Sequence, residues 1–187
     1  MKLDGVRVID LSLFLPGPQM TLMMADQGAE VIKIENPKEG EPTRQIGLAK
    51  AGHTVWFRNT HRGKKSMALN LKSEAGREIL LKLAETADVL VESFRPGVVD
   101  RLGIGYDAVK RRAPRLVYCS ISAFGQSGPL RDKPAHDLAV QALAGTVSLS
   151  LGQDAKPAAP NLPSADVTAH IVEAVHDRLG DPPATAR

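Results

Sequence analysis

Five short apolar runs recur along the first two thirds of the chain, at residues 6–11, 31–35, 66–71, 89–91 and 116–121. Runs of this length bounded by Gly, Pro or Asn are typical of buried strands. Segments of helical pattern or long polar stretches separate them, and parallel strands require such long crossover connections. The alternation therefore predicts an α/β fold in which helices cover both faces of a parallel sheet.

Helical patterns fill several of the connections. Ser73 is expected to cap one helix. The buried face of that helix carries, at a spacing of three and four residues, Ile79, Leu80, Leu83, Ala84 and Ala87. We expect further helices after Pro18 and at residues 98–102, 106–112, 137–144 and 167–179. The polar stretch 38–65 is predicted to be an unusually long connection, and a compact domain normally needs a functional reason for one.

The predicted sheet also indicates where functional residues should lie. Open parallel sheets bind their ligands beyond the carboxyl ends of the strands. This directs attention to the loops at residues 12–18, 36–65, 93–97 and 123–136. Basic side chains that follow strands or lie in the next turn suit the anchoring of phosphates, and they are Lys33, Lys72, Arg95 and Arg101. From the residues alone, the sequence predicts an α/β domain that binds an anionic ligand.

Composition excludes several other classes of protein. A net charge of +3 with only four Phe, two Tyr and one Trp does not indicate a nucleic-acid-binding surface. Cys119 is the single cysteine and no two His share the His-Glu-x-x-His spacing, so we predict no disulfide and no metal site. No apolar run reaches membrane-spanning length and no secretion signal opens the chain, so we expect a cytoplasmic protein without membrane contact.

Residues 103–108 read GIGYDA, a formal match to the dinucleotide fingerprint G-x-G-x-x-A. That fingerprint leaves a strand directly, whereas residues 98–102 are expected to be helical. The first strand is instead followed by Pro16, Gly17 and Pro18, and neither a Walker A loop nor a G-x-S-x-G elbow is present in the sequence. We therefore predict no nicotinamide or flavin site.

Three polar residues in the last third of the chain have simple structural interpretations. His136 and Asp137 follow a loop rich in Gly and Pro, where Asp137 is expected to cap the next helix while His136 fills space. Asp166 stands at the start of the last helical pattern, where its carboxylate complements the helix dipole. On residue types alone, these structural roles are favoured over catalytic ones.

A series of short strings keeps a fixed order along the chain: LDGVRVIDL at residues 3–11, PGP at 16–18, GAEVIKIE at 28–35, NLK at 70–72, ADVLVESFRPG at 87–97, DRLG at 100–103 and FGQSGP at 124–129. In this order the strings resemble the class III CoA-transferase family, which includes formyl-CoA and carnitine CoA-transferases and α-methylacyl-CoA racemases. The resemblance spans residue 3 to about residue 166. It implies a Rossmann-like parallel sheet flanked by helices, as a CoA-binding portion of the family's large domain at residues 1–166, followed by a divergent tail at 167–187.

The resemblance also implies roles for individual residues. Asp166 takes the place of the family's catalytic aspartate, which attacks the acyl-CoA thioester and then carries CoA to an acceptor acid as an aspartyl-CoA thioester. A CoA thioester is thus a substrate, and no permanently bound cofactor is implied. The residues implied to form the CoA site are Leu13, Phe14 and Leu15 lining the channel, Ser93 and Phe94 beside it, and Lys72 and Arg101 near the nucleotide and phosphates.

The family includes a second chemistry. His136-Asp137 is similar to the racemase signature, in which His136 and Asp166 would act as acid and base on opposite faces of the α-carbon. Leu138 and Ala139 stand where racemases usually carry Asn-Tyr. Transferase activity, with an acyl-CoA and a carboxylic acid acceptor as partners, is therefore the first expectation, and α-methylacyl-CoA racemase activity is the alternative.

Members of the family are considerably longer and continue past the aspartate into a small domain, which residues 167–187 do not resemble. In the family two chains interlock, so the resemblance implies a homodimer whose active site needs both domains. We therefore expect a truncated or frameshifted product, or a fragment. A CoA-binding chain without catalysis is the third hypothesis.

Overall fold

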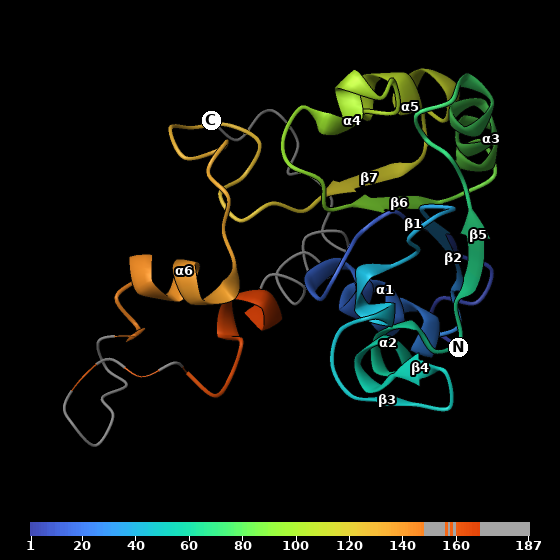
Figure 1. Cartoon of the computed structure of the whole chain (residues 1–187). Helices are drawn as coiled ribbons and strands as arrows, with labels where there is room; N and C mark the ends of the chain where they lie inside the picture. The colour runs from blue at the N-terminus through green and yellow to red at the C-terminus, as the bar shows by residue number, and fades with distance from the viewer. Residues whose placement is uncertain (148–155, 157, 159, 169–187) are drawn as a thin grey trace.

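The computed structural model describes residues 1–147, 156, 158 and 160–168, and these centre on a five-stranded sheet (Figure 1). All of its strands pair in parallel, in the order β5-β2-β1-β6-β7. The strands are β1 (Arg7–Asp10), β2 (Glu30–Glu35), β5 (Lys65–Ala68), β6 (Val89–Glu92) and β7 (Val117–Ser120). Each strand overlaps one predicted apolar run, so the predicted parallel sheet is confirmed. The helix expected at 167–179 lies outside the described residues from residue 169 onward.

Alternating side chains along the strands build two hydrophobic cores. Ile9 and Leu90 belong to one core, whereas their chain neighbours Val8 and Val91 belong to the other. Successive side chains of a strand point to opposite faces. The register places Ile9 opposite both Ile32 and Leu90, which aligns the members of one face across three strands. The sheet is therefore apolar on both faces, as a buried parallel sheet requires.

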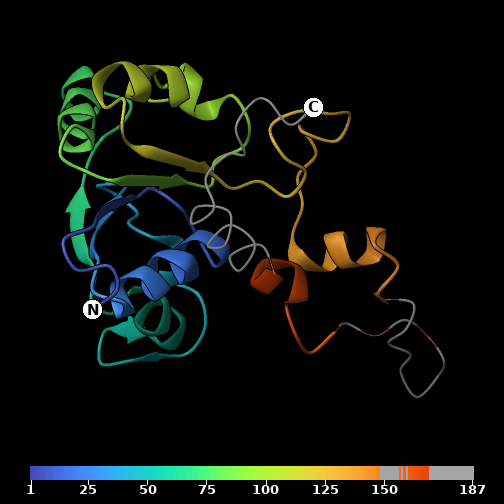
Figure 2. The same ribbon diagram turned by 180° about the vertical axis from the view of Figure 1, so that it is seen from behind.

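Helices cover these two faces unequally. α3 (Glu74–Ala84), α4 (Val98–Arg101) and α5 (Tyr106–Arg112) lie on one face, while α1 (Pro16–Asp26) lies on the other (Figures 1 and 2). Leu80 of α3 and Val109 of α5 pack in the first core, and Met20 of α1 packs in the second. Because α4 is helical, residues 103–108 follow a helix and not a strand, as the sequence predicted.

α3 begins and is buried largely as its pattern predicts. The Ser73 hydroxyl caps the helix by accepting a hydrogen bond from the Gly76 amide at 3.1 Å. Leu80 and Ala84 are fully buried, but Ile79 is 45% exposed, so its predicted place in the buried face is wrong. With about 3.6 residues per turn, the stripe facing the sheet runs through Gly76, Leu80 and Ala84, and position 79 turns away from it.

The segment predicted as one long connection, residues 38–65, is more structured than expected. It contains η1 (Pro42–Arg44), the short antiparallel pair β3 (Ala49–Lys50) and β4 (His53–Thr54), and α2 (Val55–His61). The Thr54 hydroxyl caps α2 by accepting from the Phe57 amide at 3.0 Å. An element of seven residues is too short for helical periodicity to stand out in the sequence, so these elements were not predicted.

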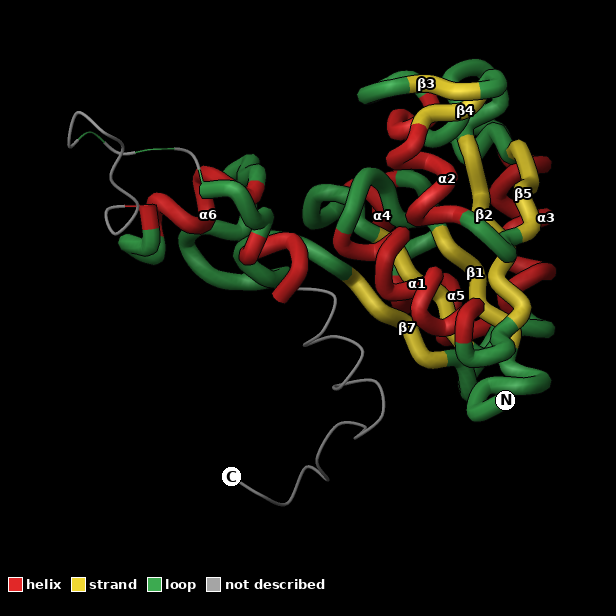
Figure 3. The backbone as a smooth tube through the Cα atoms, turned by 90° about the horizontal axis from the view of Figure 1, so that it is seen from below, coloured by secondary structure: helices red, strands yellow, loops and turns green. Residues whose placement is uncertain are grey.

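The last described elements lie to one side of the sheet (Figures 1 and 3). They are α6 (Asp137–Leu143) and a helical turn at residues 164–168. The loop after β7 leads to them, as the run of Gly and Pro at residues 125–134 predicts. Within the described part of the chain, we find no helix with the length and apolar character needed to cross a membrane.

Candidate functional site

The strand order places a topological switch point between β1 and β6. From β1 the chain proceeds to β2 and β5 on one side, and then crosses to β6 and β7 on the other. The loops that follow β1 and β6 therefore diverge, and open parallel sheets bind ligands in the crevice this creates. Gly17, just after the first loop, has no space for a side chain, because a Cβ there would lie 2.2 Å from the Cβ of Ser12.

A cavity of about 670 Å³ opens at this carboxyl edge of the sheet. It has the size of a small-molecule site, for which about 300 to 1,000 Å³ is usual. Three residues predicted to contact CoA line it: Leu13 after β1, Lys72 before α3, and Phe94 after β6. Segments that are far apart in sequence therefore meet at one cavity, at the edge where the sequence placed the ligand.

The other predicted CoA residues lie near this cavity but do not line it. Leu15 immediately precedes α1, and the exposed Phe14 adopts a φ of 65°. Ser93 instead supports the first loop, since its hydroxyl accepts from the Leu13 amide at 2.9 Å. Arg101 is exposed on α4, between the lining residues Val98 and Leu102.

Several polar residues that line the cavity were not predicted as site residues, among them Lys38 and Asn70. Lys38 follows β2 and Asn70 follows β5. The rule that singled out Lys72, a basic side chain in the turn after a strand, applies equally to Lys38. Lys38 and Lys72 supply positive charge to two walls of the cavity, where they could anchor an anionic group. Glu35 and Glu39 also line it, and Glu35 is paired with Arg44.

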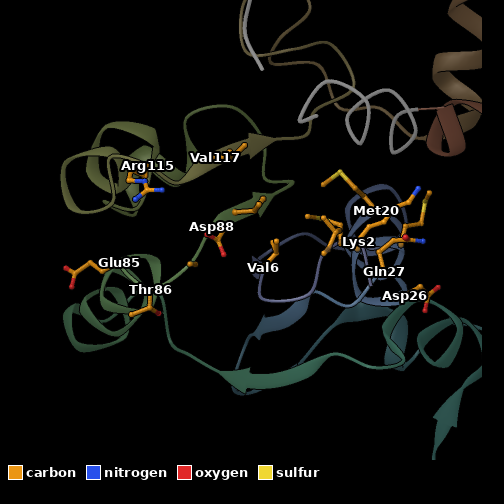
Figure 4. A pocket seen from close by; sticks show the side chains of 15 residues that line it. Lys2, Val6, Met20, Asp26, Gln27, Glu85, Thr86, Asp88, Arg115 and Val117 are labelled. Atoms are coloured by element: carbon orange, nitrogen blue, oxygen red, sulfur yellow. The ribbon is translucent and has the colours of Figure 1, made fainter. Parts of the chain in front are cut away.

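A second hollow, of about 830 Å³, lies between α1 and the amino ends of β6 and β7 (Figure 4). Met20, Val6 and Val117 contribute apolar side chains to it, and Lys2, Asp26 and Arg115 are among the charged residues that line it. Ligands of parallel sheets bind at the opposite edge. The smaller cavity at the carboxyl edge is therefore the better candidate for the site.

Four charged side chains are buried together behind the cavity: Asp10, Lys33, Glu41 and Lys64, none more than 2% exposed. The Asp10 carboxylate lies 3.0 Å from the Lys64 Nζ and also accepts from the Ser12 and Thr21 hydroxyls. Two carboxylates and two ammonium groups balance the charge of this cluster.

The prediction that Lys33 anchors a phosphate is wrong. Its Nζ donates to the Ser12 carbonyl and lies 3.7 Å from Asp10 and 3.4 Å from Glu41. Lys33 lies within β2, where every residue from Val31 to Glu35 is buried, and its ammonium group is therefore enclosed by the sheet and the loops that follow it. Its charge balances the buried carboxylates and does not reach solvent.

Burial and the charges of this cluster strongly shift the pKa of one member, Asp10, and of one neighbour, His61. Burial alone raises the pKa of Asp10, but the charges of Lys33 and Lys64 and the hydroxyl hydrogen bonds outweigh it and hold this pKa far below its usual range. Burial lowers the pKa of His61 to about 3, and the positive charges of Lys64 and Lys33 act in the same direction. His61 is therefore neutral at physiological pH, stacked on Phe57 with ring centroids 4.6 Å apart.

We expect the free energy of unfolding to fall as pH drops from 7 to 5, by about 2 kcal/mol from His61 alone. The unfolded chain binds a proton at His61 below its ordinary pKa of 6.5, whereas the folded chain does so only near 3. Acid therefore favours unfolding throughout this window, and urea titrations at several pH values measure the effect.

His61→Phe is the matched control, because it keeps the stacked ring and removes the titrating group. Burial raises the pKa of Glu92, so protonation of Glu92 at low pH stabilises the folded chain and opposes the effect of His61. Glu92 is present in both proteins, so the difference between their pH dependences comes from His61. Equal pH dependence in both proteins would contradict the assignment.

The structure brings His136, Asp137 and Asp166 together. Asp137 begins α6 but does not cap it in the expected way, since its Oδ1 accepts from the amides of Ala165 at 2.8 Å and Asp166 at 3.2 Å. Asp137 thus caps the helical turn that carries Asp166. The Gln141 side-chain amide bridges the same two segments, donating to Asp137 at 2.6 Å and to the Leu162 carbonyl at 3.1 Å.

These surroundings raise the pKa of the Asp166 carboxyl. Partial burial raises its pKa, the nearby Asp137 charge raises it further, and His136 opposes them. A more basic carboxylate is a stronger nucleophile or proton acceptor, so the site suits either chemistry. The residues lining the carboxyl-edge cavity all lie between Leu11 and Leu102, so His136 and Asp166 belong to a separate cluster that does not line it. Among the described residues we find no group of His, Cys, Asp and Glu that is arranged to hold a metal ion.

Comparison with known proteins defines the class to which this fold and these residues belong. The family described as CoA-transferase family III matches residues 3–176. The chain belongs to this family, whose enzymes use CoA thioesters as substrates. The resemblance seen in the sequence is thereby confirmed.

Particular relatives support the same assignment. The chain is 46% identical over 154 residues to an acetyl-CoA:oxalate CoA-transferase of Acetobacter aceti, covering 82% of this chain and 40% of that protein. It is 37% identical over 166 residues to a succinyl-CoA:glutarate CoA-transferase of Mus musculus, covering 88% of this chain and 38% of that one. The chain thus spans about 40% of the length of these curated relatives.

Solved structures agree with the fold. A crystal structure of a protein from Mycobacterium tuberculosis matches with a TM-score of 0.87 at 37% identity, covering 95% of this chain and 49% of that one. A CAIB/BAIF family protein from Brucella suis matches with a TM-score of 0.86 at 34% identity, covering 92% of this chain and 47% of that one. The expected α/β fold of the family is therefore present in this chain.

Proposed function

We propose that the chain acts as an acyl-CoA:carboxylate CoA-transferase, with Asp166 as the nucleophile. The observation that carries the proposal is the placement of Asp166, whose backbone Asp137 fixes and whose carboxyl pKa is raised beside His136. The names of the relatives, which pair an acyl-CoA with oxalate or glutarate, favour a small carboxylic acid as acceptor. The carboxyl-edge cavity would take the nucleotide end of CoA, with Lys72 and Lys38 near its phosphates.

The proposed reaction divides one exchange into steps at a single carboxylate. The Asp166 carboxylate attacks the thioester carbonyl, and the carbon–sulfur bond breaks, which releases the CoA thiolate and leaves a mixed anhydride of Asp166 and the donor acid. The thiolate attacks the Asp166 carbonyl and releases the donor acid, which leaves an aspartyl-CoA thioester. The acceptor carboxylate attacks this thioester and expels the CoA thiolate, which leaves a second mixed anhydride. The thiolate then attacks the carbonyl of the acceptor acid in that anhydride, which forms the new acyl-CoA and frees the Asp166 carboxylate.

Racemisation of an α-methylacyl-CoA is the second candidate, because His136 lies close enough to Asp166 to influence its pKa. A racemase needs one group to remove the α-proton and another to return it. The discriminating experiment incubates the protein with a 2-methylacyl-CoA in deuterated water, with and without an acceptor acid. Exchange of CoA that survives His136→Ala supports the transferase. Deuterium uptake without an acceptor, lost in that variant, overturns it.

A CoA-binding chain without catalysis remains the third hypothesis, and the same samples test it. Calorimetric binding of acetyl-CoA without either turnover would support binding alone. Absence of both binding and turnover would contradict all three functions. The assay therefore separates the hypotheses by which of three signals is present: binding, exchange or deuterium uptake.

We expect Lys72→Ala to weaken the binding of acetyl-CoA by about 1 to 3 kcal/mol, the usual contribution of a charge-assisted hydrogen bond to phosphate. Arg101→Ala should act in the same direction, because Arg101 lies between two residues that line the cavity. Lys82→Ala is the matched control, since Lys82 is an exposed lysine of α3 that does not line it. Calorimetry showing equal affinity in all three variants would refute the phosphate assignment.

A further inference from the structure

We propose that Glu41 is a positioning residue that joins two walls of the carboxyl-edge cavity and holds the loop at residues 12–15 in its binding conformation. The proposal rests on the function above, in which this cavity takes CoA. It assigns a role to a carboxylate that does not itself line the cavity.

The first wall is the loop after β1, and side chains hold three of its successive backbone amides. The Ser12 amide donates to Asp10 at 2.9 Å, and the Leu13 amide donates to Ser93 at 2.9 Å. The Phe14 amide donates to the Oε1 of Glu41, also at 2.9 Å. The three amides are thus held by side chains from three different segments of the chain.

The last of these hydrogen bonds acts where the backbone is strained. Phe14 has a φ of 65°, in the left-handed region that residues other than Gly rarely adopt. Its large apolar side chain is 41% exposed, so burial of the ring does not explain this conformation. Strained conformations persist when the surroundings enforce them, and they cluster at ligand-binding sites. Glu41 is the group that holds the Phe14 amide in place.

The second wall is the segment after β2, to which Glu41 itself belongs. Asn36, Lys38, Gly40 and Pro42 are among its residues that line the cavity. The Glu41 amide donates to the Oε2 of Glu35 at 2.8 Å, while the Glu41 side chain reaches back to the loop after β1. Glu41 therefore connects the two walls directly, and losing its side-chain hydrogen bond would free them to move apart.

The burial of Glu41 supports a specific role. Its side chain is fully buried, its Oε2 lies 3.4 Å from the Lys33 ammonium, and this Oε2 has no hydrogen bond. A buried carboxylate is stabilised only by such partners, and removing its charge alone would leave Lys33 incompletely balanced. A clean test must therefore remove the charge of both residues and vary only the oxygen that accepts from the Phe14 amide and, at 3.3 Å, from the Thr43 hydroxyl.

The experiment compares two charge-neutral double variants, Lys33→Met/Glu41→Gln and Lys33→Met/Glu41→Leu. Both lose the ion pair and the Lys33 hydrogen bond, but only Gln retains an oxygen that can accept from the Phe14 amide. Amide exchange followed by NMR should show the Phe14 amide exchanging at least about tenfold faster in the Leu variant, with the strand amides of β1 unchanged. Calorimetry with acetyl-CoA should show affinity about tenfold lower in the Leu variant than in the Gln variant.

The two measurements separate this proposal from the proposed function. The role of Glu41 would be overturned if the Phe14 amide exchanged at the same rate in the Gln and Leu double variants. Equal affinity of these two variants for acetyl-CoA, where they bind it, would also overturn it. If the unmodified chain does not bind acetyl-CoA, the proposed function fails, and the exchange of Phe14 still decides whether Glu41 holds the loop. If the double variants do not fold, Glu41→Asp keeps the charge but shortens the side chain, and the same comparison is made with the unmodified chain.

Discussion

Asp166→Asn should reduce transfer of CoA from acetyl-CoA to a small carboxylic acid by at least about 10⁴-fold, the scale seen when a covalent nucleophile is removed. The amide cannot form the mixed anhydride or the aspartyl-CoA thioester on which the proposed reaction depends. Chromatographic assay of the acyl-CoA products measures the loss. Mass spectrometry after trapping with hydroxylamine should detect modification of Asp166 in the unmodified chain and none in the variant.

Asp132→Asn is the matched control, because Asp132 is an exposed carboxylate in the segment before α6, with 82% of its side chain accessible. It should retain full activity. Both variants should have the melting temperature of the unmodified chain. The backbone amide of residue 166 still donates to Asp137 after the substitution. Undiminished transfer by Asp166→Asn would remove Asp166 from the mechanism.

Asp10→Ala should lower the free energy of unfolding by about 3 to 5 kcal/mol, the loss expected when one partner of a buried ion pair is removed. Glu41 would then be the one carboxylate left in the cluster to balance the charges of Lys33 and Lys64. The Ser12 amide and the hydroxyls of Ser12 and Thr21 would also lose the carboxylate that accepts their hydrogen bonds. Urea unfolding followed by circular dichroism measures the change. Because β1 occupies the centre of the sheet, we expect the whole described domain to unfold in one transition at lower urea.

Asp26→Ala provides the comparison for a surface carboxylate. Asp26 pairs with Arg62 at 2.6 Å, but 46% of its side chain is exposed, so its loss should cost less than about 1 kcal/mol. Equal destabilisation by the two substitutions would show that the buried charges are not what stabilises the centre of the sheet.

Local patterns were sufficient for much of the fold. Each apolar run that predicted a strand became one, because a parallel strand buried on both faces needs apolar residues throughout its length. The cap at Ser73 and the helix at residues 106–112 were also predictable, since both depend on neighbours in sequence. Ile79 shows the limit of this reasoning: its spacing fits a buried face, but only packing against the sheet shows which stripe of α3 is covered.

The candidate site was predictable by region and less so by residue. The rule for parallel sheets placed the ligand at the loops after the strands, and Leu13, Lys72 and Phe94 do line one cavity there. Lys33 carries the same charge as Lys72 and also lies on the sheet, but it is enclosed among carboxylates. The sequence places Lys33 within the predicted strand 31–35 and Lys72 just after another strand, but the carboxylate of Glu41 reaches Lys33 only through the folded segment after β2.

The sequence by itself determined the class of fold, the order in which strands and helices alternate, and the family to which the chain belongs. These follow from short-range patterns of apolar residues, turns and motifs. Only the tertiary structure decided that Asp137 caps the turn carrying Asp166, that His61 is a buried neutral group, and that Glu41 joins two walls of one cavity. Each of these depends on a contact between residues at least 27 positions apart or on burial by several segments, and such contacts arise only when the chain packs.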